Sequence, residues 1–499
     1  MRSEPEGEKA AIIDVGSNSV RLVLYRVADG AMRPFLNEKV MAGLGRDLSV
    51  TERLSPSGVE EALGALRRFR TLLDGLGVDR VQAAATAAVR EARDGPEFLA
   101  RVRRETDLPL RLIEGIEEAR LSALGVQAGV SEARGVIGDL GGSSLELCVL
   151  PMQTPTLGES FPLGPLALMG KDGNLGEAAG RIDVALALSE VLAHHGGGRF
   201  YAVGGAWRAL GRIDMVLRNH PVQVLHQHQI PRAELLRLTE HVRTAPRKTL
   251  EKYGEQAAKR AETLPCAALV LERIVRAGRF EEVVQSSYGL REGLLYEQLS
   301  PQERRADPLL AGAEAFGAPG ASAAAFGRQL CRWLTPALET AGAAFTPKRD
   351  AVLREAACLM ADVGGMLHPE QRRSNIFDFV LHAPYVGLTH AERVFLAAIL
   401  HHRYTKSAPS LSEQPALGLL APAQRAAAAA IGAGLRLGAD LSGRCERLLR
   451  AFDLQVREGE LRLAAEPAFE HLLTAMVLRR RDAFATALLE WRARAPAPA

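Results

Sequence analysis

Cysteine is scarce in this chain, and its placement excludes two common ways of stabilising a fold. Only five cysteines occur among 499 residues. They lie far apart and form neither a C-x-x-C pair nor a cluster with histidine: Cys148, Cys266, Cys331, Cys358 and Cys445. We therefore expect neither a disulfide framework nor a structural zinc site.

Long apolar runs are also missing. No stretch of about eighteen apolar residues occurs without a charge, and that is roughly the length needed to cross a bilayer. The N-terminal residues are polar and acidic, and the apolar run after them is interrupted by Asp14, Asn18 and Arg21, so a signal peptide is not expected. We predict a cytoplasmic protein with no integral membrane segment.

The chain has little net charge. Its 62 Lys and Arg residues and 59 Asp and Glu residues leave a formal charge of +3. We expect no nucleic acid as a partner. A protein that binds a polyanion can still be nearly neutral overall, provided that its positive charge is concentrated locally.

Two segments share a pattern that indicates phosphate binding. AIIDVGSNSVRLVLY (11–25) and GVIGDLGGSSLEL (135–147) each contain an apolar strand, an Asp, a turn of small residues and a second strand. Such a turn exposes backbone N–H groups and small hydroxyls, which suit an anion such as phosphate. The Asp stands where a Mg²⁺ bound to that phosphate could be held. Two such hairpins predict a duplicated fold with phosphate loops facing each other across a cleft.

The order of elements predicts three domains, a number that the length also favours. Strands and helices alternate over 11–129, and the same theme restarts at residue 135, as is typical of α/β lobes. Residues 306–327 are rich in Ala, Gly and Pro and predict a linker or a loosely packed hinge. Beyond them the chain is helical almost throughout, with a short strand expected in 457–463. We place the domains at 1–129, 130–305 and 306–499.

Six motifs, taken in order, resemble those of the exopolyphosphatase/guanosine pentaphosphate phosphatase family: DVGSNS (14–19), ATAAVREA (85–92), IEGIEEARL (113–121), DLGGSSLEL (139–147), VGGA (203–206) and YGLREGLLY (288–296). The resemblance implies an α/β fold of two actin-like (ribonuclease H-like) lobes. A C-terminal all-α domain related to the metal-dependent HD phosphohydrolases would follow them. The resemblance also implies a homodimer.

The C-terminal resemblance does not extend to the metal ligands of an HD site. Ala361 stands before Asp362, where the His-Asp pair would have its histidine, and no histidine occurs between His241 and His368. We expect a degenerate HD-like domain that serves as scaffold and substrate channel. Several arginines of this domain would hold a long polyanion, or they form an ordinary solvated surface. They are Arg447, Arg450, Arg479, Arg480 and Arg481.

Hydrolysis of a terminal phosphoanhydride needs an oriented water, a base and positive charge on the transferred phosphoryl group. Glu118 matches the family's catalytic glutamate. Arg90 matches its cleft arginine, which would clamp phosphate oxygens. Two alternatives stay open: Glu117 is the base instead, or both glutamates only favour the start of a helix.

The resemblance places Asp139 and Glu146 near a Mg²⁺ or another divalent cation, with Asp14 as their counterpart in the first lobe. The alternative for Glu146 is that it does not bind a metal and only pairs with a residue of the neighbouring strand at the surface. Donors to phosphate are expected from the two turns: Gly16, Ser17, Asn18, Ser19, Gly141, Gly142, Ser143 and Ser144. Trp207 follows a glycine pair that, in actin-like ATPases, contacts the adenosine. Its side chain therefore either obstructs the binding of a nucleotide base or belongs to the hydrophobic core.

With these residues in place, the family resemblance implies an exopolyphosphatase that releases terminal orthophosphate from inorganic polyphosphate by Mg-assisted attack of a water activated by Glu118. The alternative within the same chemistry is a pppGpp 5′-phosphatase, which converts pppGpp to ppGpp. The alternative outside it is a non-catalytic sensor of polyphosphate or alarmone. Intact Glu118, Asp139 and Glu146 argue against the sensor.

Overall fold

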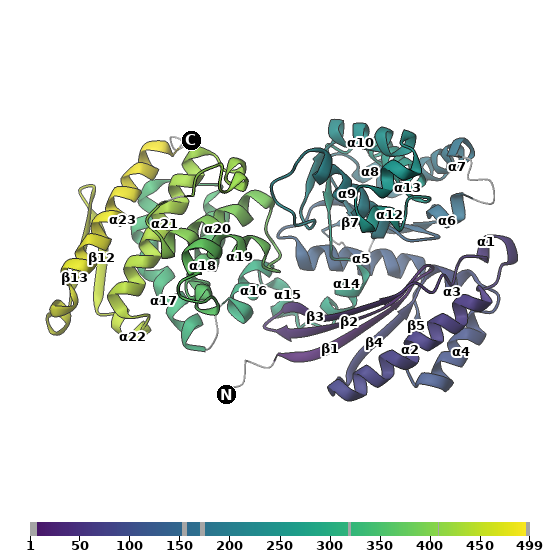
Figure 1. Ribbon diagram of the computed structural model, residues 1–499, viewed down its shortest axis with the longest axis horizontal. Helices are drawn as coiled ribbons and strands as arrows, with labels where there is room; N and C mark the ends of the chain where they lie inside the picture. Colours follow the sequence, from purple (N-terminus) through teal and green to yellow (C-terminus); the bar gives the residue numbers. More distant parts are fainter. Residues whose placement is uncertain (1–6, 152–156, 170–174, 318–320, 408, 496–499) are drawn as a thin grey trace. The chain divides into compact units, whose positions relative to one another are not determined.

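The computed structural model describes residues 7–151, 157–169, 175–317, 321–407 and 409–495. The chain divides into two units, an N-terminal unit of Gly7–Arg305 and a C-terminal unit that begins at Ala306. The N-terminal unit contains two large β-sheets, and the C-terminal unit is mainly helical (Figure 1). Among the described residues, no helix has the length and apolar character needed to cross a membrane.

The two large sheets share one strand order over five strands, and the second sheet has a sixth strand, β10, antiparallel to β11. The first runs β3-β2-β1-β4-β5, and the second runs β8-β7-β6-β9-β11-β10. In each, the first three strands are antiparallel and the next two run parallel to the third. The strands are β1 Glu8–Val15, β2 Val20–Ala28, β3 Ala31–Val40, β4 Arg80–Ala85, β5 Leu110–Leu112, β6 Gly135–Leu140, β7 Leu145–Leu150, β8 Gly158–Phe161, β9 Arg199–Val203, β10 Gln229–Pro231 and β11 Glu282–Gln285. The two predicted hairpins, β1–β2 and β6–β7, therefore occupy equivalent places, and the predicted duplication is confirmed.

Helices cover both faces of the first sheet (Figure 1), with α2 and α4 on one face and α5 and α14 on the other. In α2, apolar residues such as Leu66, Phe69 and Leu73 recur at helical spacing and pack against the strands. The helices of this unit are α1 Leu48–Thr51, α2 Pro56–Leu76, α3 Ala87–Glu91, α4 Gly95–Thr106, α5 Gly115–Gly129, α6 Pro165–Leu168, α7 Leu175–Ala187, α8 Glu190–His195, α9 Gly205–Leu217, α10 Arg232–Thr244, α11 Arg247–Glu251, α12 Glu255–Ala258, α13 Leu264–Ala277, α14 Leu290–Tyr296 and α15 Pro301–Arg305.

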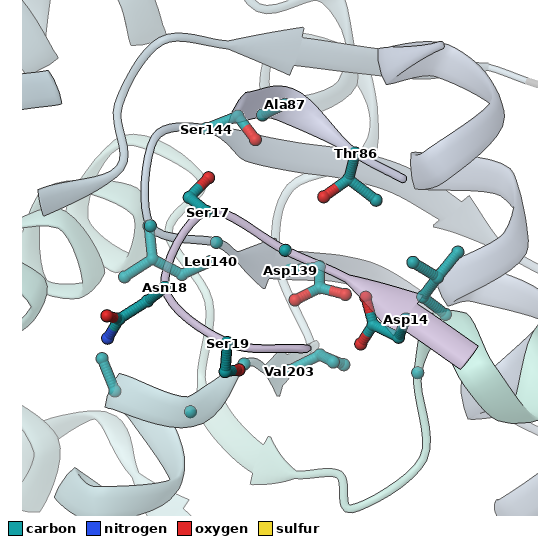
Figure 2. Close-up of a pocket in the computed structure, with 18 of the residues that line it drawn as sticks. Asp14, Ser17, Asn18, Ser19, Thr86, Ala87, Asp139, Leu140, Ser144 and Val203 are labelled. Carbon is teal, nitrogen blue, oxygen red and sulfur yellow. The ribbon is translucent and has the colours of Figure 1, made fainter. Parts of the chain in front are cut away.

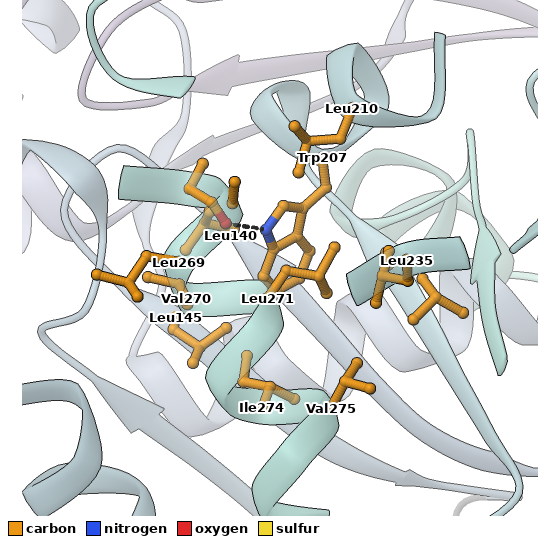
Figure 3. Close-up of a cluster of buried hydrophobic side chains, with 14 of the residues drawn as sticks. Leu140, Leu145, Trp207, Leu210, Leu235, Leu269, Val270, Leu271, Ile274 and Val275 are labelled. Atoms are coloured by element: carbon orange, nitrogen blue, oxygen red, sulfur yellow. Dashed lines mark hydrogen bonds between the residues drawn. The ribbon is translucent and has the colours of Figure 1, made fainter. Parts of the chain in front are cut away.

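Trp207, on α9, belongs to the core of the second sheet. Its side chain is fully buried among apolar residues of α9 and α13, including Leu210 and Leu271 (Figure 3). Its indole Nε1 donates a hydrogen bond to the carbonyl of Ala267 at 3.0 Å. Of the two interpretations of Trp207, the core interpretation is therefore correct.

The C-terminal unit is helical apart from a β-hairpin, β12 Phe452–Arg457 and β13 Glu460–Ala465, where the sequence predicts one short strand. Its helices are α16 Pro308–Phe316, α17 Ala321–Leu338, α18 Pro347–Leu359, α19 Arg372–His382, α20 His390–Tyr404, α21 Pro422–Ser442, α22 Glu446–Leu449 and α23 Ala475–Arg494. Short 3₁₀ turns lie between them at Glu339–Ala341, Val363–Met366, Pro415–Leu419 and Pro467–Leu472.

The predicted linker over 306–327 is wrong, because α16 and the start of α17 occupy most of it. The Asp307 side chain caps α16 by accepting a hydrogen bond from the Leu309 N–H at 2.9 Å, and Pro308 takes the first helical position. Alanine, which suggested a loose segment, is the residue with the highest helix propensity. Residues 318–320 lie outside the described residues.

Candidate active site

The two Gly/Ser turns have the same local structure. The Gly16 N–H donates to the Ser19 carbonyl at 3.0 Å, and the equivalent Gly141 N–H donates to the Ser144 carbonyl at 2.9 Å. Each turn therefore closes on itself directly after a strand whose last two residues are an Asp and an apolar residue. The duplication of the fold brings two copies of one anion-binding turn into the same unit.

The two turns also touch each other. Ser143 Oγ donates to Ser17 Oγ at 3.1 Å, and a Cβ added to Gly142 would lie 3.1 Å from the Cβ of Ser17. Within the described chain, the N–H groups of Ser17, Asn18, Gly142 and Ser143 make no backbone hydrogen bond. Those four N–H groups are therefore available to an anion.

A cavity of about 220 Å³ lies where the turns meet. It is lined by ten of the residues that the sequence predicts: Asp14, Gly16, Ser17, Asn18, Ser19, Glu118, Asp139, Gly141, Gly142 and Ser144. Three predicted residues do not line it, namely Arg90, Ser143 and Glu146. The hydroxyl of Ser143 is directed to Ser17, as described above, and the other two lie beside residues of the lining.

Asp14 and Asp139 are the second-last residues of the equivalent strands β1 and β6, and Figure 2 shows both carboxylates at the cavity. Ser122 Oγ donates to Asp139 Oδ2 at 2.6 Å, and an Arg291 guanidinium nitrogen lies 3.7 Å from Asp14 Oδ2. Burial raises the pKa of both carboxyl groups, against the opposing effect of Ser122 on Asp139 and of Arg291 on Asp14. Ionising either carboxyl group therefore costs free energy unless a cation lies nearby.

Glu146, on β7, lies directly opposite Asp139 in the antiparallel register, so the two side chains share a face of the sheet. It is only 1% exposed, so the interpretation of Glu146 as a surface partner is wrong. Ser160 Oγ donates to Glu146 Oε1 at 3.0 Å, while Oε2 is buried with no hydrogen-bond partner among the described residues. Burial, with a further contribution from Asp139, raises the pKa of Glu146 to about 8.

An unsatisfied carboxylate oxygen beside a second carboxylate fits a hard divalent cation. Among the described residues, Asp14, Asp139 and Glu146 do not bring three ligand atoms within 4.8 Å of one another. The protein therefore offers a partial set of ligands, to which substrate oxygens and water would add. Mg²⁺ is commonly held in this way, by one or two carboxylates plus phosphate.

Glu118 lies in the first turn of α5 and faces the cavity. Arg90 donates through one guanidinium nitrogen to Glu118 Oε2 at 3.2 Å and to the Ile113 carbonyl at 2.7 Å. Burial, followed by the negative charges of Glu146 and Asp139, raises the pKa of Glu118 well above its usual value. A carboxylate with a raised pKa is a stronger base once it is ionised.

The structure distinguishes Glu118 from its neighbour. Glu117 pairs with Arg111 at 2.6 Å near the surface and does not line the cavity. Arg90, which holds Glu118, lines a second cavity of about 800 Å³ that shares Ser144 with the first. Its role as a phosphate clamp stays a prediction.

Five basic side chains line the first cavity and were not singled out from the sequence: Arg21, Lys39, Arg208, Arg260 and Arg291. Burial, followed by the nearby Arg260, lowers the pKa of Lys39 to about 8, and burial, followed by Arg291, lowers that of Arg208 to about 10. The cations thus repel one another, and an anion in the cavity would relieve that repulsion. Two of the five had a readable signal: Arg21 stands opposite Asp14 in the first hairpin, and Arg291 lies within the motif YGLREGLLY.

The raised pKa of the buried Glu146 carboxyl group predicts a measurable cost in stability at neutral pH. Its pKa is higher in the folded state than the ordinary 4.5, so its stabilising effect is complete below about pH 4.5 and is lost as the pH rises toward 8. In metal-free buffer at pH 7, we expect Glu146→Gln to raise the free energy of unfolding by up to roughly 3 kcal/mol. Thermal denaturation at pH 7 and pH 4.5 measures it: the variant should melt higher at pH 7, and the difference should shrink at pH 4.5. An equal melting temperature of the two proteins at pH 7 would contradict the raised pKa of Glu146 in the folded protein.

Two sheets of the same strand order, joined at a cleft lined by paired phosphate turns, define the actin-like class of fold. Residues 23–302 match the profile of the Ppx/GppA phosphatase family, and residues 309–474 match that of the exopolyphosphatase C-terminal domain. The chain belongs to the Ppx/GppA phosphatase family.

Two similar proteins differ in the activity that their names give. A guanosine-5′-triphosphate,3′-diphosphate pyrophosphatase of Aeromonas hydrophila is 27% identical over 319 residues, which are 60% of this chain and 62% of that protein. Exopolyphosphatase 1 of Mycobacterium tuberculosis is 27% identical over 317 residues, which are 59% of this chain and 89% of that protein. The chain thus spans less than two thirds of the length of the Aeromonas relative.

Solved structures agree with the predicted fold. The Ppx/GppA family member of Aquifex aeolicus superposes with a TM-score of 0.50 at 25% identity, covering 59% of this chain and 99% of that one. An exopolyphosphatase of Cytophaga hutchinsonii superposes with a TM-score of 0.52 at 21% identity, covering 58% of this chain and 97% of that one, which supports the fold alone. The predicted family and the predicted actin-like fold are confirmed.

Proposed function

We propose that this chain is an exopolyphosphatase that releases orthophosphate from the end of inorganic polyphosphate. The observation that carries the proposal is the cavity in which two phosphate turns, a buried glutamate and five basic side chains converge. No aromatic side chain lines this cavity among the described residues. A guanine base would have no ring to stack on there, whereas a bare phosphate chain needs only donors and positive charge.

In the proposed reaction, the two turns hold the terminal phosphoryl group through the N–H groups and hydroxyls of residues such as Ser17 and Ser144. Glu118 accepts a proton from the attacking water, and Arg90 keeps its carboxylate in place. The basic residues of the cavity, such as Arg208, hold the phosphates that follow. The end of the polyphosphate therefore enters a site whose positive charge compensates its negative charge before any bond breaks.

A divalent cation, Mg²⁺ or another, is part of the proposal. Asp139 and Glu146 fit it because a buried oxygen of Glu146 lacks a partner, and Asp14 lies at the same cavity. When bound, such an ion would neutralise charge on the phosphate oxygens. The carboxylates of the protein would hold it next to the terminal phosphoryl group.

The alternative activity is hydrolysis of pppGpp to ppGpp, since the Aeromonas relative is named for a guanosine polyphosphate. A sensor without catalysis is less well supported, because Glu118 lies at the cavity in contact with Arg90. The homodimer implied by the family resemblance stays a prediction.

The experiment that tests the substrate is a comparison of orthophosphate release from long-chain polyphosphate and from pppGpp, with Mg²⁺ present. We expect polyphosphate to be hydrolysed with the higher kcat/KM, because the cavity offers charge but no ring for the base. A higher kcat/KM for pppGpp would favour the alternative.

A further inference from the structure

Two cysteines of the C-terminal unit lie beside each other, although they stand far apart in the sequence. Cys331 is on α17 and Cys358 is on α18, and these two helices pack against each other (Figure 1). A Cβ added to Gly327, one turn before Cys331, would lie 2.7 Å from the carbonyl oxygen of Cys358. Residues four apart share a helix face, so Cys331 faces α18 as Gly327 does. The two helices therefore approach closely where the two thiols meet.

The two thiols interact directly and differ in exposure. The Cys358 thiol donates a hydrogen bond to the sulfur of Cys331. Cys358 is fully buried, whereas Cys331 is only half-buried. Thr335, one turn further along α17, has its hydroxyl oxygen 4.0 Å from Cys331 Sγ. A partly exposed sulfur thus lies against a buried one.

Arg354 supplies a positive charge to this pair. It lies one turn before Cys358 on α18, and its charge favours the ionised form of Cys331, against a smaller opposing effect of Glu355. Its guanidinium group donates to Glu339 Oε1 at 3.1 Å, but its Nε is buried with no hydrogen-bond partner among the described residues. A guanidinium group beside a thiol stabilises the thiolate.

These surroundings favour the ionisation of one thiol of the pair. The hydrogen bond from Cys358, against the opposing effect of burial, lowers the pKa of Cys331 to about 7, and Arg354 lowers it further. Burial, followed by the interaction with Cys331, raises the pKa of Cys358 well above its usual value. The thiolate is the form that reacts with oxidants. Cys331 is therefore expected to react first, with Cys358 in place to react second.

The other three cysteines provide comparisons within the same chain. Cys148 and Cys266 are buried, and burial raises the pKa of their thiols to about 11 and about 12. Cys445 is exposed, directly before α22. Buried, protonated thiols should be inert, whereas Cys445 tests whether exposure alone is enough for reaction.

We propose that Cys331 is a site of reversible oxidation by a peroxide, and that Cys358 then closes a disulfide bond between α17 and α18. In the first step, the Cys331 sulfur attacks one oxygen of hydrogen peroxide, the O–O bond breaks and hydroxide leaves, so that Cys331 becomes a sulfenic acid. In the second step, the Cys358 sulfur attacks the Cys331 sulfur and the S–O bond breaks. The oxygen leaves as water with the proton of the Cys358 thiol. The site lies apart from the proposed hydrolysis and does not depend on it.

The test treats the native full chain with hydrogen peroxide at pH 7, followed by alkylation in denaturant and digestion with trypsin. We expect a covalent link between the peptide of residues 329–332 and that of residues 355–372, with a mass two hydrogen atoms below the sum of the two. Titration in denaturant should show the loss of two of the five thiols. Treatment with dithiothreitol should restore all five.

Two variants separate the two steps. In Cys358→Ala the second thiol is missing, so the reaction should stop at the sulfenic acid of Cys331, which dimedone labels. In Cys331→Ala neither position should react, because Cys358 is buried and protonated. The matched control is Cys445→Ala, which removes a thiol from the same unit and should form the link as the native chain does.

Five intact thiols after the peroxide treatment, or a link that joins other cysteines, overturns the proposal. Dimedone labelling of Cys445 in place of Cys331, in the Cys358→Ala variant, would contradict it as well. The experiment on the native chain needs no substitution, so it decides the proposal even if a variant fails to fold.

Discussion

Glu118→Gln is expected to lower the rate of orthophosphate release by roughly 10²- to 10⁴-fold, the contribution of a positioned general base. The amide keeps the size and the cavity position of Glu118 but cannot accept the proton of the attacking water. Substrate binding should survive, because the phosphate turns and the basic residues are unchanged. Single-turnover hydrolysis and equilibrium binding, measured on the same preparation, check both halves of this expectation.

The matched control is Glu117→Gln, one residue earlier on the same helix. Glu117 pairs with Arg111 near the surface and does not line the cavity. This variant should keep nearly normal turnover. If Glu118→Gln retains more than half of the native rate while Glu117→Gln loses activity, the assignment of the base is reversed.

Removal of divalent cations is expected to abolish hydrolysis, and Asp139→Ala and Glu146→Ala should each raise the concentration of Mg²⁺ needed for half-maximal rate. The physical reason is the pairing of two buried carboxylates, one with an unsatisfied oxygen, beside a phosphate turn. Titration of activity with Mg²⁺ after treatment with a chelator measures the effect.

Asp183→Ala is the control for that titration, because Asp183 is an exposed carboxylate of α7 that pairs with Arg273. Its half-maximal Mg²⁺ concentration should equal that of the native chain. Full activity of the native chain in excess chelator would refute the role of the cation.

The residues that the sequence predicted best are those whose position depends on local structure. A strand that ends in Asp and a Gly/Ser turn specify their own geometry, so the two turns, Asp14 and Asp139 could be placed before the fold was known. Glu118 could be placed on its helix from the sequence. The choice between Glu118 and Glu117 as the base, however, depends on which face of α5 meets the cavity.

The residues that the sequence could not predict reach the cavity through long-range packing. Lys39 and Arg260 approach it from β3 and from the segment before α13. Arginine is abundant along this chain, and neither residue belongs to a recognisable motif. The linker prediction was wrong for a related reason, because composition alone does not distinguish an Ala-rich helix from a loose segment. Here the Asp307 side chain caps the N-terminus of α16, which favours the helix.

Whether the chain is an exopolyphosphatase is decided by the initial rate of orthophosphate release by the native chain from long-chain polyphosphate, with Mg²⁺ and alongside pppGpp at equal concentration of terminal phosphate. We expect release from polyphosphate from the first time point, faster than from pppGpp, with gradual shortening of the remaining chains. No release from polyphosphate, or release only from pppGpp, would contradict it.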